Sequence, residues 1–243
     1  MASEIRTVGV VGLGAMGAGI AQLCLEAGLD TVGREVSLDL AGCDVVIEAI
    51  VEELVPKQEL FAELERVCSA DAVLATNTSA LSVTEIAAST SMPERVVGMH
   101  FFNPAPLMPL VEIVRAELSS DDAFETAYAL GERLGKQPIR CHDTPGFVVN
   151  RVLIPLLNDC IRVLDEARVT PEDLDTGMKG GAGWPMGPCE LVDLVGIDVH
   201  VHASAALYDK LHEPRMAPPP RLVAMRNAGL LGRKSGRGFY SYE

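Results

Sequence analysis

The stretch TVGVVGLGAMGAGIAQLCLEA, residues 7–27, decides the fold of the first half of this chain. Residues 7–12 are mostly apolar and β-branched and predict a strand, whereas residues 15–27 have the apolar spacing of a helix. The pattern G-x-G-x-x-G joins them, and its glycines permit a tight turn and let a phosphate approach the backbone where the helix begins. We therefore predict a site for the pyrophosphate of a dinucleotide at Gly12, Leu13, Gly14, Ala15, Met16 and Gly17.

An acidic residue ends the next predicted strand, residues 30–35. Glu35 lies close to the ~20-residue offset at which a carboxylate accepts hydrogen bonds from the adenosine ribose hydroxyls. Because this carboxylate would repel a 2′-phosphate, we expect NAD rather than NADP. Arg34 stands beside it and leaves NADP as the lesser alternative, since a guanidinium pairs with such a phosphate.

The composition argues against several other classes of protein. Of 243 residues 48 % are apolar, and no apolar run approaches the ~20 residues of a membrane span. The sequence begins without the features of a signal peptide, so we expect a cytoplasmic protein. The net charge of −14 disfavours a nucleic-acid partner. Six dispersed cysteines show no spacing suited to zinc, and we expect no metal site.

The order of the predicted elements indicates two domains. Strands and helices alternate through the first half, which is typical of a mostly parallel sheet with crossover helices. From Pro145 onward the pattern is helical, beginning with the amphipathic run 147–167. We expect an α/β domain of the Rossmann type at residues 1–143 and an all-α domain at residues 144–243. The other predicted strands are 44–49, 72–76, 96–102, 109–115 and 137–142, and the other predicted helices of the first domain are 53–68, 82–90 and 120–134.

A histidine and a glutamate form the strongest catalytic pattern. His100 lies between an apolar strand and a proline-stiffened turn, and Glu112 stands inside the apolar run LVEIV, where a carboxylate is costly without a partner. If Glu112 bonds one imidazole nitrogen, the other can remove a hydroxyl proton as hydride departs to a nicotinamide. The pair predicts alcohol oxidation, with Ser79 and Asn150 as candidates to hold the reacting oxygen.

Further polar residues follow the ends of predicted strands, where open α/β sheets bind ligands. Spacing alone explains each of them equally well as a solvated loop residue. They are Glu48, Glu52, Lys57, Asn77 and Ser79.

The chain resembles the 3-hydroxyacyl-CoA dehydrogenase family through motifs that span nearly its whole length: GLGAMGAGIAQ, VVIEAIVEEL, ATNTSALSV, GMHFFNPAPLMPLVEIV, DTPGFVVNR, GAGWPMGPCELVD and GRKSGRGFY. The resemblance implies reversible, NAD-dependent oxidation of an L-3-hydroxyacyl-CoA to a 3-oxoacyl-CoA, with short chains such as 3-hydroxybutyryl-CoA favoured. It also implies a helical domain that closes the substrate cleft and forms a homodimer.

The same resemblance implies roles for single residues. His100 is then the general base, Glu112 its orienting partner, and Ser79 and Asn150 contact the substrate oxygen. The implied contacts to NAD are Glu35, Glu52, Lys57, Ser79, Asn103 and Lys234.

One departure concerns residues 36–44, where family members carry several tens of residues that include a helical hairpin for CoA binding and a strand. Nine residues reach at most about 30 Å, too short for a crossover helix and another strand, so the sheet should lack an edge strand. Either the protein is truly shortened or the sequence omits the segment. In the first case CoA affinity should fall while the His100–Glu112 chemistry survives.

Two other functions stay open at this point. The missing hairpin suits a non-catalytic NAD-binding or structural protein on the same fold, which would bind the cofactor without turnover. A dehydrogenase of a free hydroxy acid would also fit a shortened CoA site, although no motif supports it.

Overall fold

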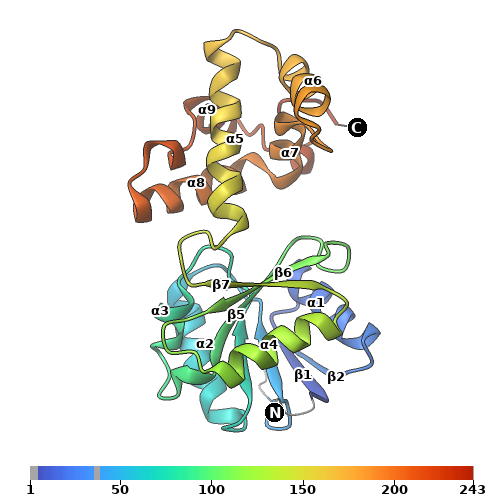
Figure 1. The fold of residues 1–243 in the computed structure, drawn as a ribbon, viewed down its shortest axis with the longest axis vertical. Helices are drawn as coiled ribbons and strands as arrows, with labels where there is room; N and C mark the ends of the chain where they lie inside the picture. The colour runs from blue at the N-terminus through green and yellow to red at the C-terminus, as the bar shows by residue number, and fades with distance from the viewer. Residues whose placement is uncertain (1–4, 36–38, 243) are drawn as a thin grey trace. The chain divides into compact units, whose positions relative to one another are not determined.

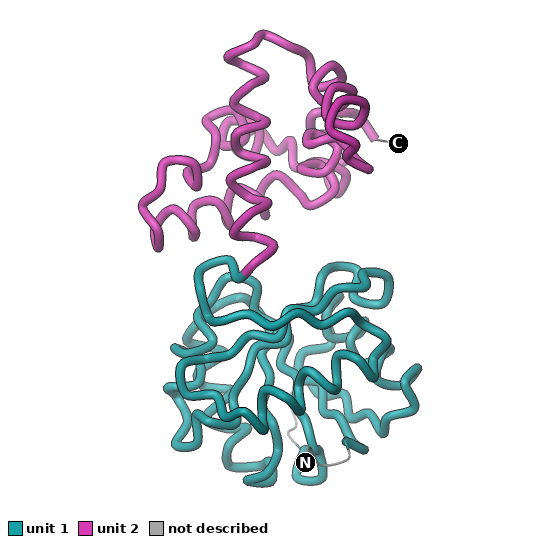
Figure 2. The backbone as a smooth tube through the Cα atoms, viewed as in Figure 1, with its two compact units in different colours: residues 1–147 teal, residues 148–243 magenta. Residues whose placement is uncertain are grey.

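The computed structural model describes residues 5–35 and 39–242, and the chain divides into two compact units (Figure 2). The first unit comprises residues 1–147 and the second residues 148–243. Part of the short segment 36–44, namely residues 36–38, lies outside the described residues.

The first unit is built on a seven-stranded sheet in the order β2-β1-β3-β4-β5-β6-β7 (Figure 1). All neighbouring strands are parallel except β5 and β6, which are antiparallel. The mostly parallel sheet confirms the predicted Rossmann-type fold class. The strands are β1 (Thr7–Val11), β2 (Asp30–Arg34), β3 (Val45–Glu48), β4 (Val73–Thr76), β5 (Val96–Phe101), β6 (Leu110–Arg115) and β7 (Gln137–His142).

Helices cover both faces of this sheet (Figure 1). On one face α1 and α4 bury residues such as Ile20 and Leu130, and on the other α2 and α3 bury Phe61 and Ile86. The helices are α1 (Ala15–Glu26), α2 (Leu54–Val67), α3 (Val83–Ala87) and α4 (Asp121–Arg133).

The helix predicted at 82–90 is shorter in the structure, because its C-terminal end is closed by side chains. Ser89 Oγ donates to the Ile86 carbonyl at 2.7 Å and Thr90 Oγ1 to the Ala87 carbonyl at 2.9 Å. Such bonds compete with continuation of a helix. At the other end Ser82 Oγ accepts from Glu85 N at 3.1 Å, which caps the start of the helix.

The described part of the connection from β2 to β3, residues 39–44, packs against β1. Leu40 and Cys43 are buried there, and a Cβ on Gly9 would come within 2.8 Å of Leu40 Cδ2 and 3.2 Å of Cys43 Sγ. Gly9 therefore makes room for a connection whose described part, residues 39–44, contains neither helix nor strand. In the described sheet the edge strands are β2 and β7.

The first unit continues past Asp143, where we expect the domain boundary. Asp143 Oδ2 accepts hydrogen bonds from Ser82 Oγ at 2.6 Å and Thr84 N at 2.8 Å, and Phe147 is buried in the core of this unit. These contacts hold residues 143–147 with the sheet.

The second unit is helical. Its core packs Leu157 and Ile161 of α5 against Val192 of α7 and Val201 of α8. The buried carboxylate of Asp193 accepts from Phe239 N, Tyr240 N and Tyr242 Oη at 2.9–3.0 Å, which ties the C-terminal segment to this core. The helices are α5 (Val149–Glu166), α6 (Pro171–Ala182), α7 (Pro188–Val195), α8 (Ile197–Leu211) and α9 (Pro220–Asn227).

No single helix within the described residues has the length and apolar composition to cross a membrane. Among the described helices one pair, α7 and α8, bent by 94° at the break between them, meets that test of length and composition when counted together.

A buried polar network in this unit centres on Asn158. Its Oδ1 accepts from His200 Nε2 at 2.9 Å and Ser204 Oγ at 3.2 Å, and its Nδ2 donates to the Arg215 and Met216 carbonyls at 3.1 and 3.2 Å. Burial lowers the pKa of His200 from 6.5 to about 4. The folded protein therefore keeps this imidazole neutral well below neutral pH.

We predict an acid-sensitive helical unit. As the pH falls from about 6.5 to about 4, His200 is protonated in the unfolded chain but stays neutral in the folded chain. The free energy of unfolding therefore decreases across this pH range. When the pH is lowered from 7 to 4.5, the free energy of unfolding should fall by about 2 kcal/mol less in His200→Gln than in the parent. Glutamine does not titrate in this range but can still donate a hydrogen bond to Asn158.

Urea unfolding followed by fluorescence of Trp184, the only tryptophan of the chain, checks this, because Trp184 packs against the core of the same unit. Equal losses in parent and variant would assign the acid sensitivity to another group.

Candidate active site

The glycine-rich loop joins β1 to α1 through close backbone contacts. Gly12 has φ +88°, and a Cβ there would lie 2.8 Å from the Ala49 carbonyl carbon after β3. A Cβ on Gly17 would collide with the Gly12 carbonyl oxygen, whereas a Cβ on Gly14 would meet no heavy atom within 4 Å. Two glycines thus allow tight packing, and the third leaves the backbone open to a phosphate.

The predicted ribose carboxylate lies at this loop. Glu35 is exposed, and its Oε1 accepts a hydrogen bond from Leu13 N at 2.7 Å. Arg34 Nη1 instead folds back onto the Gly33 carbonyl at 2.9 Å. The group that faces the loop is therefore an acid, which favours a ribose hydroxyl over a 2′-phosphate.

The loop also lies at the topological switch point of the sheet. From β1 the chain moves to β2 on one side and returns to β3 on the other. Ligands of open α/β sheets bind outside the carboxyl ends of the strands at such a point. The residues that end β3 and β4 are therefore candidates to line the site.

Three charged side chains lie close together near those strand ends, with Lys57 between the carboxylates of Glu48 and Glu52. Lys57 of α2 is 1 % exposed, and its Nζ lies 2.5 Å from Glu48 Oε1 and 3.5 Å from Glu52 Oε2. Glu48 is fully buried and also accepts from Ile50 N and Thr76 Oγ1, both at 2.7 Å. Because the Lys57 ammonium is paired with the carboxylates of Glu48 and Glu52, we expect Lys57 to affect a bound ligand through its contact with Glu52.

Glu52 holds the loop that carries Ser79. Its Oε1 accepts from Thr78 Oγ1 and Ser79 N at 2.7 Å, and from Ser79 Oγ and Ala80 N at 3.1 Å. Burial by itself raises the pKa of the Glu52 carboxyl, but Lys57 and these hydrogen bonds outweigh burial and lower that pKa below its ordinary value. Glu52 is therefore anionic and fixes the position of Ser79.

His100 and Glu112 face each other across the antiparallel pair β5 and β6. They are direct partners in the register, and His100 Nδ1 lies 2.6 Å from Glu112 Oε2. Glu112 is fully buried and His100 is 5 % exposed, with the rings of Phe102 and Phe147 at 4.6 and 5.7 Å from the imidazole. A carboxylate at Nδ1 makes Nε2 the nitrogen for acid–base chemistry.

The remaining predicted site residues lie in two different units of the chain. Asn103 is exposed in the loop that follows β5. Asn150 lies in the first turn of α5, in the second unit. Lys234 also belongs to the second unit, where its Nζ lies 2.6 Å from Asp198.

The sequence reasoning did not identify the roles of Thr76, Thr78 and Asn77 as anchors. Asn77 Oδ1 accepts from Phe101 N at 2.9 Å, which joins the ends of β4 and β5, and the two threonines bond Glu48 and Glu52. The run of polar residues TNTS directly after a buried strand is the signal that marks them.

Comparison with known proteins matches both units. The NAD-binding domain of 3-hydroxyacyl-CoA dehydrogenase matches residues 36–144, and the C-terminal domain of 3-hydroxyacyl-CoA dehydrogenase matches residues 146–242. A 3-hydroxybutyryl-CoA dehydrogenase of Mycobacterium tuberculosis is 41 % identical over 286 aligned positions, which cover all of both chains. Because this chain has 243 residues, the relative carries positions without a counterpart here.

Solved structures agree with this. The crystal structure of M. tuberculosis FadB2 has a TM-score of 0.96 and 38 % identity, and covers 99 % of this chain and 100 % of that one. The crystal structure of (S)-3-hydroxybutyryl-CoA dehydrogenase PaaH1 from Ralstonia eutropha has a TM-score of 0.94 and 37 % identity, with the same coverage.

The Rossmann-type sheet and the open glycine loop with its facing acid define an oxidoreductase that uses NAD. Within that class, the chain belongs to the 3-hydroxyacyl-CoA dehydrogenase family, because both domains of that family match consecutive parts of it.

Proposed function

We propose that this protein catalyses the reversible, NAD-dependent oxidation of short-chain L-3-hydroxyacyl-CoA, such as 3-hydroxybutyryl-CoA, to 3-oxoacyl-CoA. The observation that carries the proposal is the buried His100–Glu112 pair at 2.6 Å in a unit that also holds the dinucleotide loop. The similarity to enzymes named 3-hydroxybutyryl-CoA dehydrogenase supports the choice of substrate.

In this mechanism His100 is the general base and Glu112 its positioning partner. Glu112 fixes Nδ1 and stabilises the imidazolium, while Nε2 takes the proton of the substrate hydroxyl as the C3 hydride leaves and the carbonyl forms. Bound NAD supplies the acceptor for that hydride. In the reductive direction the His100 imidazolium returns the proton to the oxygen.

Hydrogen-bond donors to the reacting oxygen stabilise the charge that develops on it. We assign this role to Ser79, whose backbone amide Glu52 holds at 2.7 Å. A serine hydroxyl has one proton, so the Ser79 hydroxyl, which donates to Glu52 at 3.1 Å, turns to the reacting oxygen when the substrate binds. For Asn150 the family resemblance supports the same role. Glu35, Glu52, Asn103 and Lys234 are proposed contacts of NAD, with Lys57 acting through Glu52.

Turnover of acetoacetyl-CoA tests this mechanism. Purified protein with acetoacetyl-CoA and NADH should consume NADH, and loss of the general base in His100→Ala should lower kcat by about 10²- to 10⁴-fold. Glu112→Gln, which keeps the shape but not the charge, should lower kcat by up to about 10⁴-fold. NADPH should support much slower turnover than NADH, because the Glu35 carboxylate would repel a 2′-phosphate.

Other results of this assay would point to a different function. NADH binding without turnover would favour a non-catalytic NAD-binding protein, and turnover of free acetoacetate alone would favour a hydroxy-acid dehydrogenase. Unchanged turnover in His100→Ala would remove His100 from the mechanism.

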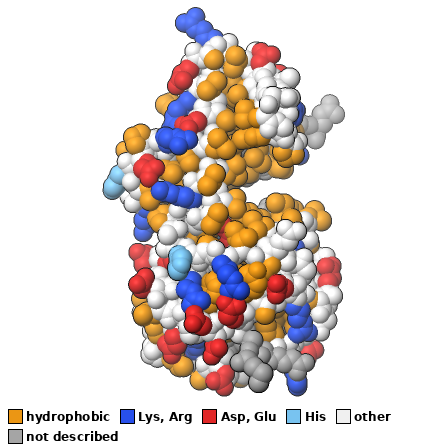
Figure 3. Space-filling model, in the orientation of Figure 1, with side chains coloured by type: hydrophobic (Ala, Val, Ile, Leu, Met, Phe, Trp, Pro, Cys, Tyr) orange, Lys and Arg blue, Asp and Glu red, His pale blue; other side chains and the backbone are white. Residues whose placement is uncertain are grey.

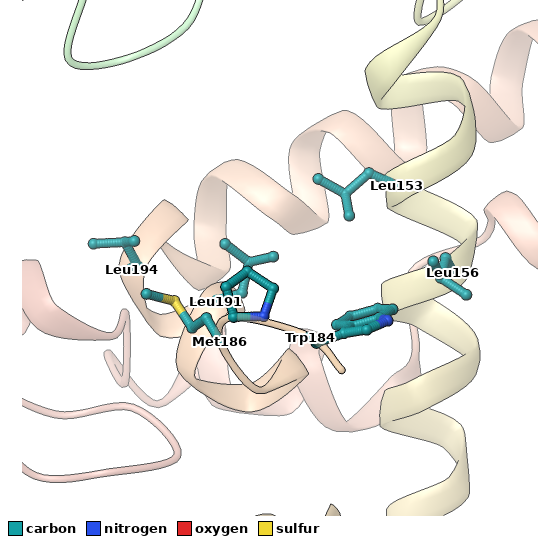
Figure 4. Close-up of a pocket in the computed structure, with 7 residues that line it drawn as sticks. Leu153, Leu156, Trp184, Met186, Leu191 and Leu194 are labelled. Atoms are coloured by element: carbon teal, nitrogen blue, oxygen red, sulfur yellow. The ribbon is translucent and has the colours of Figure 1, made fainter. Parts of the chain in front are cut away.

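An apolar pocket in the helical unit offers a place for the acyl chain (Figure 4). It has a volume of about 460 Å³, and Figure 4 shows Leu153 pointing from α5 toward the side chains of α7. Asn150 precedes Leu153 by three residues on α5, so both share one helix face. The lining residues are Leu153, Leu156, Trp184, Pro185, Met186, Leu191 and Leu194.

We predict that filling this pocket changes the preference for chain length. Leu153→Trp should lower kcat/KM for a 3-oxooctanoyl-CoA by about tenfold relative to acetoacetyl-CoA, because a longer chain buries more methylene groups there. Val163→Trp is the matched control, since Val163 is exposed on the same helix and does not line the pocket. An unchanged ratio in Leu153→Trp would place the acyl chain elsewhere.

We further propose that the protein is a cytoplasmic homodimer that acts in fatty-acid metabolism, including β-oxidation. Apolar side chains gather on the surface of the helical unit (Figure 3). Val195 at the end of α7 and Val199 at the start of α8 are 44 % and 49 % exposed. A second copy would cover such side chains in a symmetric interface.

The mass in solution tests the dimer. Light scattering should give twice the chain mass of 25.9 kDa, and Val199→Glu should give a monomer because a carboxylate opposes burial. Leu25→Glu, an exposed apolar position in the first unit, should stay dimeric. A dimeric Val199→Glu would move the interface to another surface.

A further inference from the structure

The loop of residues 102–109 connects the two strands that carry His100 and Glu112. It runs from the end of β5 at Phe101 to the start of β6 at Leu110, and it contains Asn103. Within the loop, Leu107 N and Met108 N both donate to the Pro104 carbonyl at 3.0 Å. The Leu107 side chain is 79 % exposed, so the outer part of the loop is exposed and the anchors must lie on its inner side.

One of these anchors is a buried ammonium. Lys136 is 8 % exposed, and its Nζ donates to the carbonyls of Ala105 at 2.7 Å, Met108 at 2.9 Å and Pro106 at 3.3 Å. An ammonium has three protons, and each is directed at a carbonyl of this loop. Charge-assisted bonds of this kind are stronger than neutral ones.

The position of Lys136 is itself fixed by the backbone. Gly135 has φ +71°, and Lys136 N donates to the Gly131 carbonyl at 3.1 Å as α4 ends. Gln137 N then donates to the Pro109 carbonyl at 2.7 Å where β7 begins. The lysine therefore reaches the loop from a rigid junction between a helix and a strand.

The same loop also rests on the dinucleotide helix. A Cβ on Gly19 of α1 would come within 3.0 Å of Pro106 Cδ and 3.3 Å of Ala105 Cβ. The loop thus contacts both α1, which follows the glycine-rich turn, and Lys136. A displacement of the loop would move Asn103 relative to that turn.

We propose that Lys136 is a positioning residue for dinucleotide binding, which holds residues 102–109 so that Asn103 meets the cofactor. This rests on the proposed function, in which Asn103 contacts NAD. Lys136 acts through three backbone carbonyls and does not itself touch substrate or cofactor.

Binding of NADH in the absence of acyl-CoA provides the test. Lys136→Met, which keeps the length of the side chain and removes its donors, should raise the Kd for NADH about tenfold by nucleotide fluorescence. Lys136→Arg should recover part of the affinity because it keeps the charge and several donors. Lys179→Met, an exposed lysine of the helical unit, should bind NADH like the parent.

A double-mutant cycle separates positioning from a general loss of stability. Because Lys136 acts through Asn103, the effect of Lys136→Met on the Kd should largely vanish in an Asn103→Ala background. In turnover, KM for NADH should rise while KM for acetoacetyl-CoA changes little. If Lys136→Met does not fold, Lys136→Gln, which retains an amide donor, takes its place in the cycle.

A parental Kd in folded Lys136→Met, or fully additive effects in the cycle, would overturn the proposal. Absence of acetoacetyl-CoA turnover in the parent would contradict the proposed function instead. The NADH cycle still decides the role of Lys136 in that case, because it needs no acyl-CoA.

Discussion

The first unit depends on how a fully buried carboxylate, Glu112, is compensated inside a sheet. A carboxylate in the middle of a strand covered on both faces costs several kcal/mol unless a hydrogen-bonded partner is present. The reversal of β6 relative to β5 supplies that partner, because direct antiparallel neighbours project from the same face of the sheet. The 2.6 Å contact between Glu112 Oε2 and His100 Nδ1 stabilises the buried carboxylate and also fixes the orientation of the imidazole.

The same solution recurs at the ends of β3 and β4. Glu48 and Glu52 share Lys57, and the hydrogen bonds of both acids are completed by threonine hydroxyls and backbone amides. Removing one member of such a network would leave another charge buried and unpaired. The network therefore holds the Ser79 loop, and the sheet holds His100.

The short connection from β2 to β3 leaves the strands that carry His100 and Glu112 uninterrupted. Gly9 lets Leu40 and Cys43 pack directly against β1, so a few residues suffice for the crossing. The glycine-rich loop, the switch point and the His100–Glu112 pair all lie on strands that this connection does not interrupt.

The order and type of the elements could be predicted from the sequence, because apolar periodicity and glycine positions are properties of neighbours along the chain. The strands were predicted to within one residue at each end, and the partnership of His100 with Glu112 followed from the cost of a carboxylate in an apolar run. Which side chains from distant elements meet became clear from the folded structure. The burial of Lys57 between two acids depends on how α2 packs beside β3 and β4, and the three carbonyls at Lys136 depend on where α4 ends beside a loop about thirty residues earlier. Such contacts are set by packing across the fold, and no local pattern encodes them.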